Sequence, residues 1–188
     1  LARHATCALE LGKTDKLFAS GVIIEPRGEL LTSFEVVERA LDVPSLITDA
    51  QGRQLDLEGV LGFDVRLGWV ALRVHDRLDP SRRFPCVPLG DSRRLRPESE
   101  IITMGSPTSL PWTCGEGHVR HPGRVLPEHF RCVMQIEATT VPGGCGSGAF
   151  TQDGALVGLD VKHLMPGVES NEAGFELTVP IHEIQLPG

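Results

Sequence analysis

Apolar runs of strand length alternate with turn residues along most of the chain. Two hairpins are predicted in the first half, at residues 19–33 with Pro26, Arg27 and Gly28 in the turn, and at residues 44–62. Helical signals are confined to residues 36–41 and 182–185. Further strands are predicted at 4–11, 69–74, 100–106, 147–150, 155–164 and 174–181, with two more around a Pro/Gly tip within 114–138. Many short strands with few helices indicate an all-β fold of barrels or a sandwich.

The composition fits this pattern and narrows the classes of function. The chain has 188 residues, of which 40% are hydrophobic, 21 are Gly and 14 are Pro. This suits one large domain, or two small subdomains that share an interface. The net charge of −7 argues against nucleic-acid binding, which needs a basic surface. No apolar run approaches the ~18 residues of a membrane helix, so we expect no membrane segment.

The stretch VPGGCGSGAF, residues 141–150, has the composition of a nucleophile loop. Glycines surround the single Cys145, and glycine allows backbone shapes that place several main-chain N–H groups around one reactive atom. A nucleophile also needs a base, so the rest of the chain decides whether Cys145 has a catalytic role.

Five motifs resemble segments of the HtrA/Deg-type proteases of the trypsin fold, and they occur in the order of that family. They are SGVIIEPRGELLTSFEVV, LGFDVRLGWVALRV, PLGDSRRLRPESEIITMGSP, QIEATTVPGGCGSGAFTQDGALVGLD and GFELTVPIHEI. The resemblance implies a trypsin-like double barrel, with two six-stranded β-barrels and short helices. We expect the N-terminal barrel at 1–80, a solvated linker at 81–97 and the C-terminal barrel at 98–188.

All three catalytic positions of the family are replaced in this chain. By the resemblance, the family's His falls on Glu35, its Asp on Gly68 and its Ser on Cys145. Proton transfer from a thiol of pKa about 8.5 to a carboxylate of pKa about 4.3 costs roughly 5.7 kcal/mol before any bond forms. A nearby carboxylate also raises the pKa of a thiol, and glycine has no side chain that orients a base. The glycines remain, so we expect the family's oxyanion hole at Gly143, Gly144 and Cys145.

One alternative is an unusual cysteine protease that uses Cys145. Such an enzyme needs a base from elsewhere in the chain or from a partner. None of the seven histidines falls where the family places its base, although His118 lies on a strand of the second barrel by the resemblance.

Another alternative is a metal-binding module within residues 114–132. That segment holds Cys114, His118, His121, His129 and Cys132. Two histidines three residues apart on a strand should face opposite sides, so a site would have to form across the hairpin. The spacing fits no zinc template, and a disulfide between Cys114 and Cys132 is a further alternative in an oxidising compartment.

Several other residues fit structural roles. We expect Trp69 in the core, Trp112 in a loop where packing is its main role, and Ser147 in a local hydrogen bond within its loop. The Gly90–Ser92 stretch, GDS, should be a turn. Glu35 itself could cap the helix that begins beside it. We also expect buried thiols at Cys7, Cys86 and Cys132.

These observations favour a catalytically inactive HtrA-like protease homologue that serves as a binding or scaffolding module. Its partner would be a protein or peptide, since a strand of substrate can pair with a barrel edge without being cleaved. No cofactor is expected. The resemblance is compatible with a homo-oligomer and with a periplasmic, extracytoplasmic or organellar location, but the five cysteines exclude neither an oxidising nor a reducing compartment.

Overall fold

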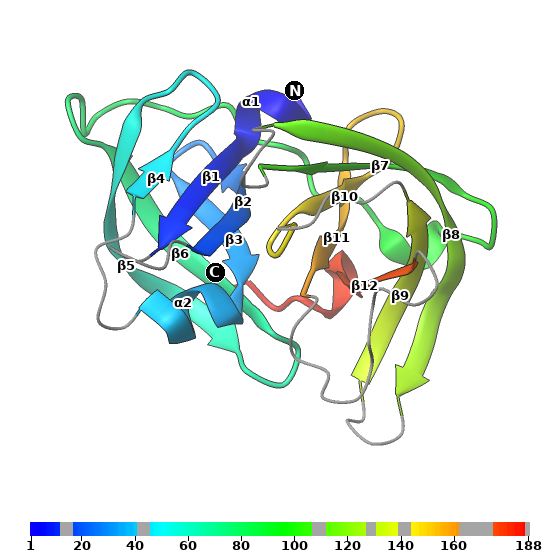
Figure 1. Ribbon diagram of the computed structural model, residues 1–188. Helices are drawn as coiled ribbons and strands as arrows, with labels where there is room; N and C mark the ends of the chain where they lie inside the picture. Colours follow the sequence, from blue (N-terminus) through cyan, green and yellow to red (C-terminus); the bar gives the residue numbers. More distant parts are fainter. Residues whose placement is uncertain are drawn as a thin grey trace.

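Two closed β-barrels of six strands each lie side by side (Figure 1). The computed structural model describes residues 1–11, 17–40, 46–106, 112–126, 131–138, 144–161 and 175–186. The predicted all-β double barrel is therefore confirmed.

The first barrel has the strand order β1-β2-β3-β6-β5-β4, with all neighbours antiparallel. Its strands are β1 (Thr6–Leu11), β2 (Leu17–Glu25), β3 (Glu29–Ser33), β4 (Leu46–Thr48), β5 (Gln54–Asp64) and β6 (Trp69–Asp76). Helix α1 (Ala2–Ala5) precedes β1, and helix α2 (Phe34–Ala40) follows β3 directly. The predicted hairpins and the short helix after β3 are thus present.

The second barrel has the order β10-β11-β12-β9-β8-β7. Its strands are β7 (Glu100–Gly105), β8 (Thr113–Leu126), β9 (Arg131–Ala138), β10 (Gly148–Phe150), β11 (Leu156–Asp160) and β12 (Phe175–Pro180). The 3-10 helices η1 (Ser92–Arg94) and η2 (Ile181–Glu183) pack against each other, because the Ser92 hydroxyl lies 2.6 Å from His182 Nδ1. The GDS stretch therefore has the structural role that was predicted.

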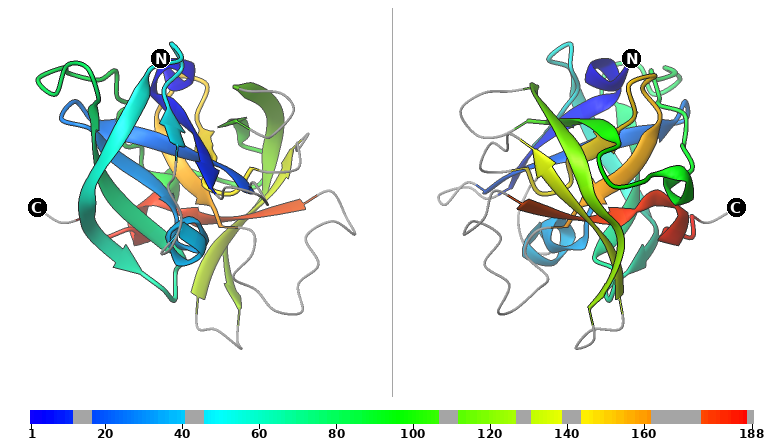
Figure 2. Two further views of the ribbon diagram at one scale, coloured as in Figure 1. Left: turned by 60° about the vertical axis from the view of Figure 1, so that its left-hand side comes forward. Right: turned by 90° about the vertical axis from the view of Figure 1, so that its right-hand side faces the viewer.

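The barrels share a continuous apolar core. Residues of the first barrel such as Leu30 and Trp69 belong to the same buried cluster as Phe150 and Leu159 of the second. After β12 the chain returns to the first barrel (Figures 1 and 2), where Ile184 joins that cluster. Trp69 is 3% exposed, as expected for a core residue. A site formed between the barrels is therefore supported by packed side chains of both barrels.

The segment between the barrels is not solvated throughout, which corrects the prediction for residues 81–97. Phe84 and Val87 are 5% and 1% exposed, and each donates its backbone N–H to the first barrel, to Pro26 O and Ile23 O. The apolar side chains that punctuate this Arg- and Pro-rich stretch dock it on the barrel, because burying them removes apolar surface from water. Cys86 is only partly buried, whereas Cys7 is fully buried as predicted.

The hairpin of β8 and β9 departs from the predicted pairing of its cysteines. Cys132 lies opposite Val125, whereas Cys114 lies beyond the end of β9 and pairs with Met104 of β7. The two sulfurs therefore cannot meet, and all five cysteines are free thiols. Cys132 is partly rather than fully buried.

The two histidines of β8 do not alternate as predicted. Both His118 and His121 are exposed, because register shifts between Val119 and His121, and again before Arg124, interrupt the alternation of the strand. His129 lies outside the described residues. Within the described part of the chain, no group of three His, Cys, Asp or Glu side chains is placed to hold a metal ion. No described helix has the length and apolar character needed to cross a membrane.

Candidate functional site

The site is built around Cys145 and Glu35, which the fold brings together from opposite barrels. The Cys145 thiol donates a hydrogen bond to the Glu35 carboxylate, with 3.4 Å between Sγ and Oε2. Glu35 is only 6% exposed, and Cys145 is half-buried. A carboxylate and a thiol 110 residues apart thus share one buried contact.

Glu35 owes its place to the direct passage from β3 into α2. It lies in the first turn of that helix, where a negative charge interacts favourably with the helix dipole. The entry is fixed on one side by Phe34, whose backbone N–H donates to Gly68 O at 2.8 Å and whose ring lies 5.5 Å from that of Phe63. The carboxylate is therefore held by the helix start rather than by a flexible loop.

Gly68 lies at the end of the β5–β6 turn, next to this helix start. Its backbone has a φ of +80°, and its N–H donates to Asp64 O at 2.7 Å. A left-handed conformation of this kind favours glycine over residues with a Cβ. Gly68 thus contacts the helix start through its backbone alone.

The turn that carries Cys145 is fixed from both sides. Within it, the Ser147 N–H and hydroxyl both donate to Gly144 O, which is the local hydrogen bond predicted for Ser147. Gly146 has a φ of +81°, and a Cβ there would lie 2.1 Å from Ser20 O. Only glycine fits such a position, because the backbone of the first barrel occupies the space of any side chain. Gly143, the other residue predicted for the oxyanion hole, lies outside the described residues.

Ser20 on β2 anchors this turn to the first barrel and was not singled out by the sequence. Its N–H donates to Cys145 O at 2.8 Å, its carbonyl accepts from Thr32 Oγ1 at 2.6 Å, and its hydroxyl accepts from Ser106 N at 2.7 Å. Ser20 is fully buried, so each of these bonds replaces one to water. A small polar residue in an apolar strand carries no signal of such a role before the partner barrel is known.

The surroundings of Cys145 favour the protonated thiol. Burial makes the largest contribution to raising the pKa of Cys145 well above its ordinary value, followed by the charges of Asp160 and Glu35. A side-chain hydrogen bond from Ser33 lowers that pKa, but by less than the other groups raise it. Asp160 is 3% exposed and, like Ser20, was not predicted as a site residue.

Five histidines lie in the described part of the chain, and three of them interact with residues outside the Cys145 site. His4 bonds to Gln51, His75 lies 4.0 Å from Asp56, and His182 bonds to Ser92. His118 and His121 are on the exposed strand β8, and His118 lies opposite Glu137 and Glu100. No described histidine contacts Cys145 or Glu35. Within the described residues, the side chain that meets the Cys145 thiol is therefore a carboxylate.

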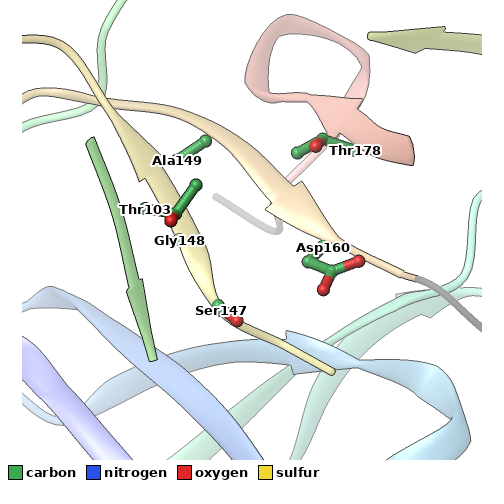
Figure 3. A pocket seen from close by; sticks show the side chains of 6 residues that line it. All are labelled: Thr103, Ser147, Gly148, Ala149, Asp160 and Thr178. Carbon is green, nitrogen blue, oxygen red and sulfur yellow. The ribbon is translucent and has the colours of Figure 1, made fainter. Parts of the chain in front are cut away.

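A narrow hollow lies in the second barrel next to the Cys145 turn (Figure 3). Ser147 and Gly148 line it from the turn and β10, while Asp160 and Thr178 line it from β11 and β12. It leaves no room for a water molecule. The Thr178 hydroxyl is buried and has no hydrogen-bond partner within the described residues. The hollow is therefore too narrow to hold a ligand.

A family model described as a trypsin-like peptidase domain matches residues 19–159, most of the chain. The chain belongs to this family. The match covers Glu35, Gly68 and Cys145, so these three residues lie within the matched trypsin-like domain.

Curated relatives and solved structures agree with this assignment. Over 142 residues, or 75% of this chain, the trypsin-like domain is 29% identical to the "Probable periplasmic serine endoprotease DegP-like" of Marinomonas sp. (strain MWYL1), and 30% identical to the protein of the same description from Pseudomonas putida (strain W619). The matches cover only 29% and 28% of those relatives. The structure described as "HtrA-type protease AlgW with tripeptide" superposes with a TM-score of 0.81 at 22% identity, over 97% of this chain and 58% of that one. The resemblance to HtrA-type proteases is thereby confirmed.

Proposed function

We propose that this trypsin-like domain binds an extended protein or peptide segment beside Cys145 and does not cleave it. Glu35, Gly68 and Cys145 then stand at the family's His, Asp and Ser positions as a degenerate triad. The single observation that carries the proposal is the hydrogen bond from the Cys145 thiol to the Glu35 carboxylate.

The chemistry of that contact opposes nucleophilic catalysis. A cysteine nucleophile attacks as the thiolate, and its base must accept the thiol proton. The carboxylate of Glu35 accepts a hydrogen bond from the neutral thiol and repels the thiolate, so both effects keep the proton on sulfur. In an active triad, the imidazole would become a cation that stabilises the thiolate.

Gly68 adds a second argument. The orienting residue of a triad accepts a hydrogen bond from the base through its side chain. Gly68 offers only backbone groups, and these are engaged with Asp64 and Phe34. The alternative of a cysteine protease would require a lowered thiol pKa, whereas burial and two carboxylates raise it.

The backbone around Cys145 supports retention of a binding role. The turn keeps the glycine at position 146 and is fixed to the first barrel by Ser20. Rigid backbone next to barrel strands can pair with an extended segment through main-chain hydrogen bonds. A binding module derived from a protease would lose the catalytic triad but keep this rigid turn, which is what we propose for this domain.

Cleavage and binding of unfolded casein test the two halves of the proposal separately. Fluorescein-labelled reduced casein should remain intact on prolonged incubation with the domain, while its fluorescence anisotropy rises on binding. Cys145→Ala should leave binding unchanged, as should the matched control Cys114→Ala, which alters an exposed thiol on β8. Cleavage that Cys145→Ala abolishes and Cys114→Ala retains would refute the loss of catalysis. Absence of any anisotropy change would refute the binding role.

A further inference from the structure

A second, larger hollow lies on the outer face of the first barrel, between β5 and β6. Its volume is about 350 Å³, within the range of ligand sites. It is lined by β5 at Glu58, Gly59 and Val60, by β6 at Arg73 and His75, and by the β2–β3 turn at Arg27. All these residues belong to the first barrel, so this groove is separate from the Cys145 site.

The hollow exists because Gly59 stands opposite Arg73 in the sheet. A Cβ at Gly59 would meet no atom within 4 Å, so the space above this residue is open. A register shift between Leu57 and Gly59 widens the strand at this point. Without a side chain at Gly59, a ligand can approach the backbone of β5 closely here.

Hydrogen bonds within the domain hold the Arg73 side chain on the wall of the groove. Its guanidinium donates to Glu29 Oε1 at 2.8 Å and to Arg27 O at 3.4 Å. A guanidinium carries five N–H donors, so the remaining ones are available to a ligand. Its side chain is 24% exposed. Arg73 therefore resembles a fixed hydrogen-bond fork more than a free surface side chain.

The turn that carries Arg27 is also held in place. Gly28 N donates to Glu25 O, Val74 N donates to Gly28 O at 2.8 Å, and Phe84 N donates to Pro26 O. Gly28 has a φ of +87°, and a Cβ there would lie 2.0 Å from Val74 O. Within the described residues, no acceptor binds the guanidinium of Arg27, which is exposed. Two guanidiniums thus border one hollow, and His75 adds a third donor at its rim.

The β5 wall of the groove limits which anionic ligands can bind. Glu58 lines the groove from β5, and it repels an isolated anion such as phosphate. A peptide presents a backbone N–H beside each side chain, so it can donate to Glu58 while its own carboxylate meets the arginines. Exposed Val60 and Pro80 offer contacts to neighbouring apolar side chains.

From this arrangement we infer that the groove between β5 and β6 binds an acidic, extended peptide segment. A Glu or Asp side chain of the ligand pairs with Arg27 and Arg73, and its backbone N–H donates to Glu58. The segment lies over Gly59, where no side chain blocks it. This site would give the domain a second peptide contact, independent of the one beside Cys145.

Titration with short peptides, followed by amide NMR shifts, tests this inference. The probes are acetyl-Leu-Glu-Leu-Glu-Leu-amide, the same peptide with Gln in place of Glu, and inorganic phosphate. We expect saturable shifts at Gly59, Arg73 and His75 with the Glu peptide, weakening as salt is added. Arg27→Gln should weaken binding about tenfold, as loss of one charge-assisted contact predicts. Gly59→Leu should abolish it by filling the groove.

The matched control is Arg66→Gln, which removes an exposed arginine outside the groove and should leave the affinity unchanged. The inference is overturned if the Gln peptide or phosphate binds as tightly as the Glu peptide. It is overturned equally if Gly59→Leu or Arg27→Gln binds like the unaltered domain, or if no saturable shift is seen. None of these outcomes bears on the role of Cys145.

Discussion

The thiol of Cys145 donates to the carboxylate of Glu35 across the junction of the two barrels, at a Sγ–Oε2 distance of 3.4 Å. This relationship reverses the electrostatics of a protease triad. A neighbouring imidazolium would stabilise a thiolate, whereas a neighbouring carboxylate destabilises one and accepts a hydrogen bond from the neutral thiol. The domain therefore combines the fold of the family with a Cys145 thiol whose surroundings favour the protonated form.

Replacing the acceptor should change the reactivity of the thiol in a graded way. Glu35→Gln removes one of the two charges that raise the pKa of Cys145, so alkylation of Cys145 at pH about 8 should become faster. Glu35→His should speed it further, because an imidazolium stabilises the thiolate. Rates are measured on the peptide that contains Cys145 by mass spectrometry. Equal rates in all three proteins would show that Glu35 does not govern the thiol.

Gly146 should tolerate no side chain. Gly146→Ala combines a left-handed backbone with a clash against Ser20 O, so we expect a loss of at least about 3 kcal/mol in the free energy of unfolding. Gly154→Ala is the matched control, since Gly154 has a φ of +86° but an open environment. It should lose only about 1 to 2 kcal/mol. Urea denaturation measures both, and equal losses would contradict the close approach of the two barrels at Gly146.

Ser20 should stabilise the junction between the barrels. Ser20→Ala leaves the Ser106 N–H without its acceptor in a buried place, which should cost about 1 to 3 kcal/mol of unfolding free energy. Ser81→Ala, which removes an exposed hydroxyl bonded to Asp79, should change it by less than about 0.5 kcal/mol. A Ser20→Ala protein as stable as the Ser81→Ala control would show that this bond does not support the junction.

Asp76, at the end of β6, should contribute to the pH dependence of stability. A hydrogen bond from Arg82 lowers the pKa of Asp76 most, followed by the backbone N–H of Leu78. A pKa lower in the folded than in the unfolded state stabilises the fold above the unfolded pKa of about 3.9, and this contribution is lost as pH falls through the folded pKa. Asp76→Asn should therefore be less stable than the parent at neutral pH, with the gap closing in acid. Urea denaturation across acidic pH measures this, and a gap that widens on acidification would contradict it.

Local patterns in the sequence were sufficient to predict an all-β fold with hairpins, whereas the two barrels and the positions of Glu35, Gly68 and Cys145 followed from the family resemblance. Alternation and turn residues located the hairpin around Gly28. The glycines around Cys145 marked the turn that contacts the first barrel. The contact of Cys145 with Glu35 followed from the family resemblance alone, since no periodicity relates residues 110 positions apart.

The features that were missed depend on tertiary packing. Ser20 and Asp160 lie within apolar strands, where a single polar residue shows no sign of its tertiary neighbours. The alternative of a disulfide between Cys114 and Cys132 is not realised, because β8 is longer than β9 and its register is shifted twice. Phe84 was overlooked because its charged neighbours dominate the composition of the linker.

The central proposal is that Cys145 stands protonated beside a carboxylate at the position of the family's catalytic centre. The most direct measurement is the rate of Cys145 alkylation by iodoacetamide from about pH 6 to about pH 10, spanning the ordinary thiol pKa of about 8.5, with reduced glutathione as the reference thiol. We predict a rate at neutral pH below that of glutathione, still rising at the alkaline end of the range where glutathione levels off. A rate that exceeds that of glutathione at neutral pH and levels off below about pH 7 would identify an activated thiolate and contradict the account.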